Sequence, residues 1–250
     1  MINILSIDWD YFVCPKKEKD IAEFPDGHDF GLDLSTFIWV NYYNEKLIRH
    51  SSFKVKDIKI NKKEMDFIQD YLQQARPYRT MVVNSHQHIY DFITDNVDTN
   101  TEINLVNIDF HHDLYRQGKE LDCGNWLKYI MRKYPKTSQY IWIHRDISDM
   151  KNMMYKKRIK MEEDLYSLDK IMDKDNVDFI FVCKSYIWSP PHLDKYFNQC
   201  FKPIMDKCII QMKEDKIFTD RYKMVKKYLN DPLRRDMDQL YEMQRAFNPS

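Results

Sequence analysis

The chain has 250 residues, of which 43% are hydrophobic, 14% aromatic and 31% charged. This composition is typical of a folded globular protein rather than a disordered one, and the length fits one large domain. Lysine plus arginine equals aspartate plus glutamate at 39 each, so the net charge does not favour a general nucleic-acid or anionic-membrane binder. We therefore expect a single domain over residues 1–250 that binds neither nucleic acid nor membrane.

The cysteines and the N-terminal segment indicate the cellular compartment. The five cysteines are odd in number and form no Cys-x-x-Cys pair, so neither a disulfide framework nor a structural zinc site is expected. The opening MINILSID has no basic segment followed by a long apolar one, which excludes a signal peptide. No stretch approaches the roughly 18 apolar residues of a transmembrane helix. The sequence predicts a cytoplasmic protein.

Five short apolar runs predict buried β-strands. They are rich in isoleucine, valine, leucine and aromatic residues, and they are nearly continuous rather than alternating. Runs of this kind are typical of a parallel sheet that is covered on both faces. The predicted strands are Ile2–Ile7, Thr80–Val83, Ile103–Ile108, Tyr140–Ile143 and Val177–Val182.

Residues 13–60 carry a weaker pattern. Two prolines and two glycines precede an aromatic-rich segment, Phe37–Tyr43. Prolines and glycines in this number indicate a loop. We expect that loop to be followed by irregular or β structure packed on the core.

Helix-like segments lie between and after the predicted strands. In Lys62–Arg76, the apolar residues Met65, Ile68 and Leu72 recur at helical spacing, and Pro77 ends the pattern. Alternating strands and helices predict an α/β fold with a mainly parallel sheet flanked by helices on both faces. The other predicted helices are His88–Asn96, Trp126–Lys133, a long charged helix, continuous or broken, over Asp149–Met172, Pro190–Cys208 and Arg221–Phe247.

Polar side chains follow three of the predicted strands directly. In open α/β sheets, sites form beyond the carboxyl ends of the strands. In an extended segment, residues i and i+2 point to the same side, so side chains at this spacing reach one site together. By the same rule His112 points the other way, and we expect it to pack or hydrogen-bond inside. The converging residues are Asp8 and Asp10 after the first strand, His86 after the second, and Asp109, His111 and Asp113 after the third.

These six residues have the chemistry of metal ligands. Four carboxylates in one place repel one another unless a countercharge is present, and divalent ions supply one. Mixed carboxylate and imidazole ligands suit manganese, zinc or iron. A catalytic zinc needs only three protein ligands, so six ligands favour two ions that share carboxylates and together activate a water molecule. The alternative is that these polar residues merely cap strands and helices.

Two of the three segments resemble motifs of a known family. The sequence DFHHD over Asp109–Asp113 resembles the DxHxD motif of the arginase-like ureohydrolases, and SIDWD over Ser6–Asp10 resembles their SxDxD motif. His86 stands where that family has a metal-binding histidine at a strand end. The order is permuted, because SxDxD comes first here and last in arginases.

Further signals are similar to one branch of that family, which includes the peptide arginases. These signals are the Val82-Val83 pair before the histidine, the Asn125-Trp126 pair, and a strand with Trp142 and His144. The resemblance covers about residues 80–146 and the first twelve residues. It implies an arginase/deacetylase-like fold and hydrolysis of arginine side chains in a ribosomally made precursor peptide, giving ornithine and urea.

The resemblance also implies a metal content. Two Mn²⁺ ions would be bound, and Asp8 and Asp109 would bridge them. Family members often assemble, so a homo-oligomer is compatible with the resemblance. The first ion would be held by Asp8, His86, Asp109 and Asp113, and the second by Asp8, Asp10, Asp109 and His111.

The chain departs from arginases at two positions that bear on the substrate. Tyr115 replaces an asparagine that helps bind the carboxylate of free arginine, and Leu127 replaces a histidine that serves as proton shuttle. The first departure favours a peptide substrate. His144 is then the best candidate for general acid or base, and Asp146 is a candidate for binding the guanidinium group.

Three further residues are candidate substrate contacts: Tyr115, Asn125 and Trp188. Trp188 lies in the loop after the fifth predicted strand, which either lines the mouth of the site or is a rigid structural loop.

Two other functions stay open. A zinc amidohydrolase on the same fold, such as a deacetylase, would use one ion with two aspartates and one histidine as ligands. A catalytically silent binding protein would keep the cluster for structure or hold no metal. A metal count separates the first of these from a manganese ureohydrolase.

Overall fold

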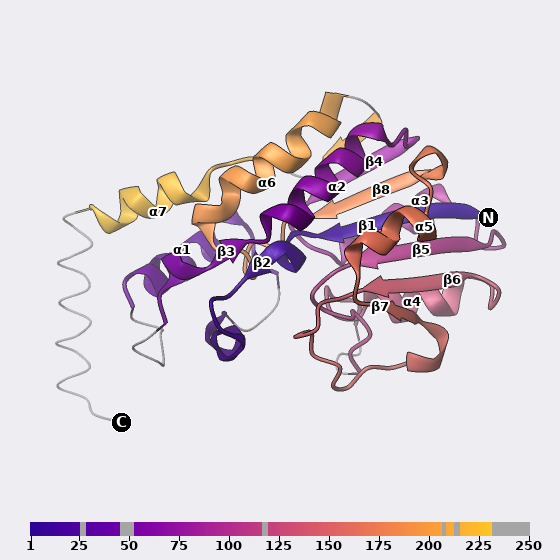
Figure 1. Cartoon of the computed structure of the whole chain (residues 1–250), viewed down its shortest axis with the longest axis horizontal. Helices are drawn as coiled ribbons and strands as arrows, with labels where there is room; N and C mark the ends of the chain where they lie inside the picture. The colour runs from indigo at the N-terminus through magenta and orange to yellow at the C-terminus, as the bar shows by residue number, and fades with distance from the viewer. Residues whose placement is uncertain (26–28, 46–52, 117–119, 207–208, 213–215, 232–250) are drawn as a thin grey trace.

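A computed structural model describes residues 1–25, 29–45, 53–116, 120–206, 209–212 and 216–231 (Figure 1). Within these ranges every helix is too short or too polar to cross a bilayer. The strands are β1 (Ile2–Asp8), β2 (Val13–Cys14), β3 (Lys59–Ile60), β4 (Arg79–Val83), β5 (Ile103–Ile108), β6 (Gln139–Ile143), β7 (Lys160–Glu162), β8 (Phe179–Cys183) and β9 (Ile209–Met212). The helices are α1 (Leu32–Tyr43), α2 (Lys62–Gln74), α3 (His88–Asn96), α4 (Trp126–Lys133), α5 (Leu168–Ile171), α6 (Asp194–Phe201) and α7 (Arg221–Leu229).

The main sheet has seven parallel strands in the order β7-β6-β5-β1-β8-β4-β9. The central strand β1 pairs with β5 on one side and with β8 on the other. All seven strands run in the same direction, so their carboxyl ends lie at one edge. The predicted α/β class with a parallel sheet is confirmed, and all five predicted strands are present.

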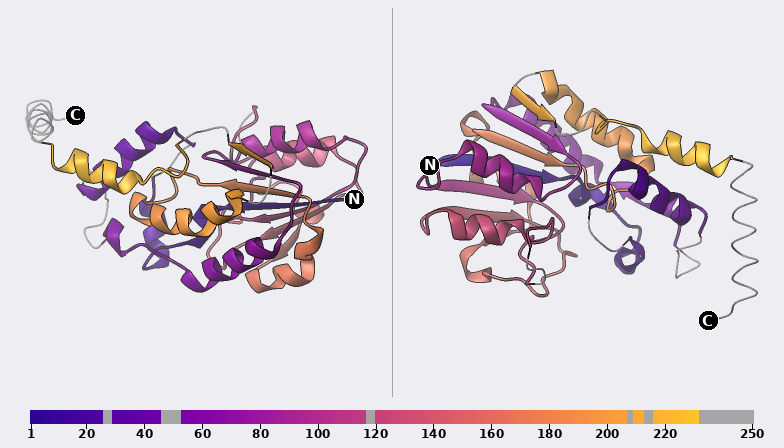
Figure 2. Two further views of the ribbon diagram at one scale, coloured as in Figure 1. Left: turned by 90° about the horizontal axis from the view of Figure 1, so that it is seen from above. Right: turned by 180° about the vertical axis from the view of Figure 1, so that it is seen from behind.

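Helices cover both faces of this sheet, as the views from above and from behind show (Figure 2). Alternate side chains of β1 enter opposite layers because successive residues of a strand point to opposite faces. Leu5 and Ile7 pack in the layer under α2 and α6, whereas Ile4 packs in the layer under α3 and α4. Each such buried side chain stabilises the fold by about 1.5–3 kcal/mol.

Helix α2 shows why the periodic segments were predictable. The side chain of Asn61 accepts a hydrogen bond from the backbone N–H of Glu64 at 3.4 Å and so caps the first turn. Met65, Ile68 and Leu72 are buried against the sheet. The helix ends at Gln74, close to the predicted end.

Helix α1 contradicts the expectation for the segment Phe37–Tyr43, which is helical rather than irregular or β. Trp39 and Val40 are fully buried, but Leu34 and Phe37 on the same helix are each half exposed. The apolar residues of α1 therefore lie on all sides of the helix, and no one-sided apolar stripe marks it in the sequence. With α7 and the β2–β3 pair, α1 lies beyond the carboxyl ends of the strands (Figure 1).

The prediction of a long charged helix over Asp149–Met172 is wrong. The segment instead contains turns, β7 and the short helix α5. Asn152 and Tyr155 have positive φ values of 56° and 54°, which a right-handed helix does not accept. The backbone N–H of Met154 donates to the carbonyl of Leu114 at 2.9 Å, and β7 extends the sheet beside β6. Pairing at the sheet edge thus outweighs local helix propensity.

The predictions for the C-terminal part of the chain are correct only in part. Within Pro190–Cys208 the α-helix covers only Asp194–Phe201, flanked by 3-10 turns, and residues 207–208 lie outside the described residues. Strand β9 beside β4 was not predicted. The last predicted helix is present over Arg221–Leu229, and its residues 232–247 lie outside the described residues.

Candidate metal centre

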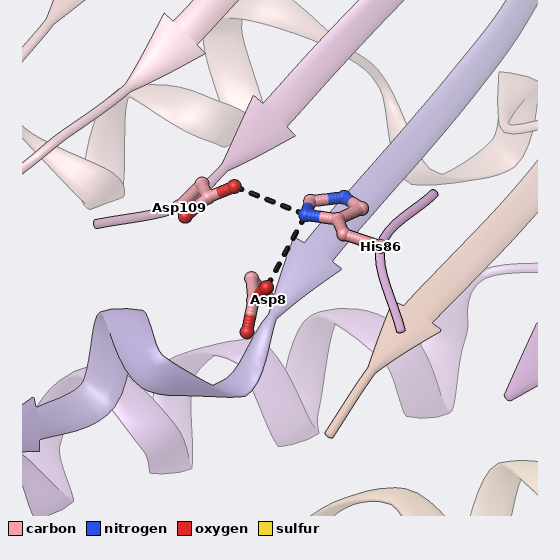
Figure 3. A group of neighbouring side chains, drawn as sticks. All are labelled: Asp8, His86 and Asp109. Carbon is pink, nitrogen blue, oxygen red and sulfur yellow. Dashed lines mark ion pairs between the residues drawn. The ribbon is translucent and has the colours of Figure 1, made fainter. Parts of the chain in front are cut away.

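Three strands that end at one edge of the sheet bring the predicted ligands together. Asp8 is the last residue of β1, and Asp109 directly follows β5, whose Ile108 is paired with Ile7 of β1. His86 follows β4, which is separated from β1 by β8 alone. Figure 3 shows the side chains of Asp8, His86 and Asp109 pointing toward one another from three separate segments.

The first group of ligands surrounds His86. Its Nδ1 lies 3.2 Å from Oδ2 of Asp8, 3.1 Å from Oδ2 of Asp109 and 3.2 Å from Oδ2 of Asp113. All four side chains are at most 5% exposed. One ring nitrogen carries at most one proton, so it cannot donate well to three carboxylates at once. A cation between these atoms would satisfy all of them.

The second group surrounds His111. Its Nδ1 lies 2.9 Å from Oδ2 of Asp10 and 3.9 Å from Oδ1 of Asp109. Oδ2 of Asp10 is buried and faces this ring nitrogen. Asp109 directs one oxygen to each group, so the two groups share it.

Hydrogen bonds from neighbouring residues orient these ligands. Ser6 Oγ lies 2.8 Å from Nε2 of His86, so a proton on Nε2 would leave the Nδ1 lone pair facing the carboxylates. Ser185 Oγ donates to Oδ2 of Asp8 at 2.6 Å. Trp126 Nε1 donates to Oδ2 of Asp113 at 2.6 Å.

The backbone contributes as well. The N–H of His111 donates to Oδ1 of Asp109 at 2.7 Å, and the N–H of Asp10 donates to Oδ1 of Asp8 at 3.1 Å. Asp113 has a positive φ of 50°, a conformation that aspartate tolerates better than most residues.

The electrostatics of the centre call for added positive charge. Burial raises the pKa of Asp8, Asp10 and Asp113, and nearby carboxylates raise it further. Burial disfavours the charged form of both histidines, yet the surrounding carboxylates raise the pKa of His86 to about 10 and that of His111 to about 9. Without a metal ion, the centre therefore retains protons as its countercharge.

The predicted ligands fit metal ions. The groups Asp8–His86–Asp109 and Asp10–Asp109–His111 each bring their donor atoms close enough to hold an ion, and Asp113 lies beside the first group. All donors are oxygen or nitrogen, which suits manganese, zinc or iron. All six residues predicted as ligands thus lie at one centre.

The structure separates the predicted catalytic residues from one another. His144 is buried, with Nδ1 2.8 Å from the carbonyl of Arg145 and its ring 4.6 Å from that of Trp142. Trp142 Nε1 in turn donates to the carbonyl of Asp109 at 2.9 Å, so His144 is one side chain away from a ligand residue. Asp146 is exposed and joins neither ligand group among the described residues.

The three predicted substrate contacts also differ. The Trp188 ring lies 4.8 Å from that of His111, at the open side of the centre. Asn125 is fully buried, and its side chain bonds the backbone of Asp122 and Glu120. These bonds give Asn125 a role in the loop before α4.

The Tyr115 ring packs against that of His112, with their ring centres 4.0 Å apart and their planes tilted by 39°. His112 Nε2 lies 3.0 Å from the carbonyl of Lys151, and its Nδ1 accepts from the N–H of Leu114 at 3.0 Å. His112 is therefore a packed, hydrogen-bonded residue, as predicted.

Three residues near the ligands were not assigned roles from the sequence. Ser6 could have been found, since it lies two residues before Asp8 on the same face of β1. Ser185 follows the end of β8, where a strand-end rule also applies. Asp29 accepts from the N–H of His86 at 3.2 Å, and burial and Asp8 raise its pKa to about 7. No sequence pattern marks it.

The described cysteines Cys14, Cys123, Cys183 and Cys200 are free, as expected. No family model matches the chain, and no curated protein or solved structure matches it either. The metal centre itself therefore carries the functional interpretation.

Proposed function

We propose that this chain is a metal-dependent hydrolase with a binuclear centre that acts on the guanidinium group of arginine side chains in a peptide. The observation that carries the proposal is the pair of ligand groups that share Asp109. The choice of substrate rests on the resemblance of DFHHD and SIDWD to ureohydrolase motifs. A cytoplasmic precursor peptide and two Mn²⁺ ions belong to the same proposal.

The proposed reaction adds water across a C–N bond. The water oxygen bonds to the guanidinium carbon, the bond from that carbon to the side-chain nitrogen breaks, and the nitrogen takes up a proton. The products are an ornithine side chain and urea. Two bound divalent ions would supply an activated water and stabilise negative charge near neutral pH.

The residues of the chain position this chemistry. Asp109 spans both ligand groups and so determines their spacing. Ser185 and Ser6 hold Asp8 and His86 in place. The centre is reached from the side of His111, whose side chain is 20% exposed, whereas that of His86 is 3% exposed. A substrate would therefore approach over His111.

The test is reconstitution of the purified chain with Mn²⁺, followed by incubation with an arginine-containing peptide and, in parallel, with free arginine. Mass spectrometry detects the loss of CH2N2 from the peptide, and a coupled assay detects urea. Asp109→Asn is the inactive control. Conversion of the peptide alone supports the proposal and agrees with Tyr115 in place of the arginase asparagine.

Other outcomes select the other functions. One tightly bound zinc ion and release of acetate from an acetyl-lysine peptide would support a deacetylase. Two bound ions without turnover of either substrate class would support a binding protein.

A further inference from the structure

The open side of the metal centre leads into an apolar pocket of about 50 Å³. The ligands Asp10 and His111 form part of its wall. Every other described lining side chain is apolar, and most of them are half-buried. These residues are Val13, Pro15, Ile21, Phe24, Phe110 and Trp188.

The walls come from three segments that the fold brings together. Val13 to Phe24 follow β1, Phe110 follows Asp109 directly, and Trp188 belongs to the loop after β8. Neighbouring contacts support these walls. The Phe24 ring meets the buried Trp39 ring of α1 edge-on at 6.2 Å, and the N–H of Trp188 donates to the carbonyl of Ser185 at 3.0 Å. The pocket is therefore formed before any ligand binds, as small-molecule sites usually are.

We propose that this pocket determines substrate specificity by accepting an aliphatic side chain next to the reacting arginine of a peptide. The inference rests on the proposed function. An occupant of the pocket touches Asp10 and His111, so it is continuous with a group that reacts at the metal centre.

The polarity of the wall excludes a free amino acid as the preferred substrate. Beyond the two candidate ligands, no described side chain of the wall carries a charge that would pair with an α-ammonium or α-carboxylate group, and the indole N–H of Trp188 is a single neutral donor. Such charged groups would lose water there without gaining a countercharge, which is unfavourable. An apolar side chain gains by leaving water in the same place.

The size of the pocket favours an aliphatic group. A cavity of about 150 Å³ holds a benzene molecule. The space here is smaller and open on one side, so a branched side chain of three or four carbons, as in valine, isoleucine or leucine, fits it better than a ring of six.

The test compares matched peptides with the Mn²⁺-loaded full chain. Each peptide has one arginine, with leucine or serine placed before it, after it or on both sides. We expect kcat/KM for urea release to be at least tenfold higher for one leucine position than for serine, within the range that apolar pockets achieve. Equal values for all peptides, or equal values for free arginine and the leucine peptides, would overturn the inference.

Variants test whether the preference for leucine arises in the pocket. Ile21→Ser and Phe24→Ser should reduce the leucine-to-serine ratio to near one, whereas Leu34→Ser, at a half-exposed apolar position of α1 outside the pocket, should leave the ratio unchanged. Circular dichroism checks that each variant folds. An unchanged ratio in a folded Ile21→Ser and a folded Phe24→Ser variant would contradict the assignment.

Binding separates this inference from the proposed activity. If no peptide releases urea, the proposed activity fails, and calorimetry of the same peptides with the metal-free chain then decides about the pocket. Tighter binding of the leucine peptide to the original chain but not to Ile21→Ser supports the pocket. Equal binding of leucine and serine peptides overturns it.

Discussion

Two buried groups of charged side chains lie on either side of the loop after β8, and their charges are balanced in different ways. In the metal centre, burial raises the pKa of Asp8, Asp10 and Asp113. In the second group, which we call the structural triad, Lys184, Asp194 and Arg221 are all fully buried. Arg221 and Lys184 there hold the pKa of Asp194 below its usual value despite the burial.

In the structural triad, the carboxylate is paired with cations of the protein itself. Asp194 accepts from Nε of Arg221 at 2.9 Å and from its Nη2 at 2.6 Å, and Lys184 Nζ lies 3.3 Å from the same carboxylate. Burial alone therefore does not identify a site. A carboxylate cluster that lacks its countercharge points to a ligand, whereas a paired one points to structure.

The two groups are also connected. Arg221 donates to the carbonyls of Tyr186 at 2.6 Å and Ser189 at 2.8 Å, on either side of Trp188. The same loop carries Ser185, whose hydroxyl bonds Asp8. Lys184, Asp194 and Arg221 thus hold in place the loop that orients one ligand and forms part of the pocket.

Loss of the structural triad should destabilise the protein more than any other change considered below. Asp194→Asn leaves Lys184 and Arg221 buried without an anion, which should lower the free energy of unfolding by about 3–5 kcal/mol. Urea unfolding of the metal-free chain measures this loss. Asp66→Asn, at an exposed position of α2, is the control and should change it by no more than about 0.5 kcal/mol. A loss below about 1 kcal/mol for Asp194→Asn would mean that the triad is not structurally important.

The matching change in the metal centre should cost less stability. Asp10→Asn removes the carboxylate beside the His111 imidazolium, but burial and Asp109 disfavour the ionised form of that carboxylate, so the metal-free chain should lose less free energy of unfolding than Asp194→Asn loses. Metal analysis should show a drop from two bound ions to one, because the group around His86 remains. Retention of two ions would contradict the role of Asp10 as a ligand.

A pH dependence of metal binding follows from the histidines. In the metal-free chain the pKa of His86 is about 10 and that of His111 about 9, so both are protonated at pH 7 and must lose a proton to bind an ion. Affinity for Mn²⁺ should therefore increase between pH 6 and 9. Calorimetry in two buffers of different ionisation enthalpy should detect proton release on binding, and the absence of release would contradict the prediction.

The same shifts affect the metal-free fold. Both pKa values lie above the usual histidine value of 6.5. The stabilisation from these two imidazolium groups is complete below about pH 6.5 and is lost as the pH rises through about 9 and 10. Thermal unfolding of the metal-free chain between pH 6 and 10 checks this loss, which bound ions should suppress.

The smallest expected effect comes from Ser185. Ser185→Ala removes the hydrogen bond to Asp8 and should weaken metal binding about tenfold, the lower end of the range for residues that orient ligands. Ser167→Ala is the matched control, since that hydroxyl has no hydrogen-bond partner among the described residues. Equal affinities of both variants in a metal titration would show that Ser185 does not orient Asp8.

Elements with local patterns were predictable from the amino-acid sequence. The five apolar runs became strands because each is buried on both sides, and α2 was recognisable from its apolar stripe and from Pro77. The six predicted ligands were found in the same way. Strand ends and i+2 spacing are properties of a short segment, and a parallel sheet places all its carboxyl ends at one edge. The strand order, which puts β5 beside β1 and β4 two strands from β1, decides which of these ends are close enough to share a site.

The packing of the folded chain selects which distant segments meet. Residues 149–172 lack their predicted helix because they pair with the sheet edge and with the segment after β5. Ser185 meets Asp8 across 177 residues, and Asp29 meets His86 across 57. Arg221, on helix α7, bonds the loop around Trp188. Local patterns report how deeply a residue is buried, but partners so far apart along the chain are selected by packing, which no local pattern records.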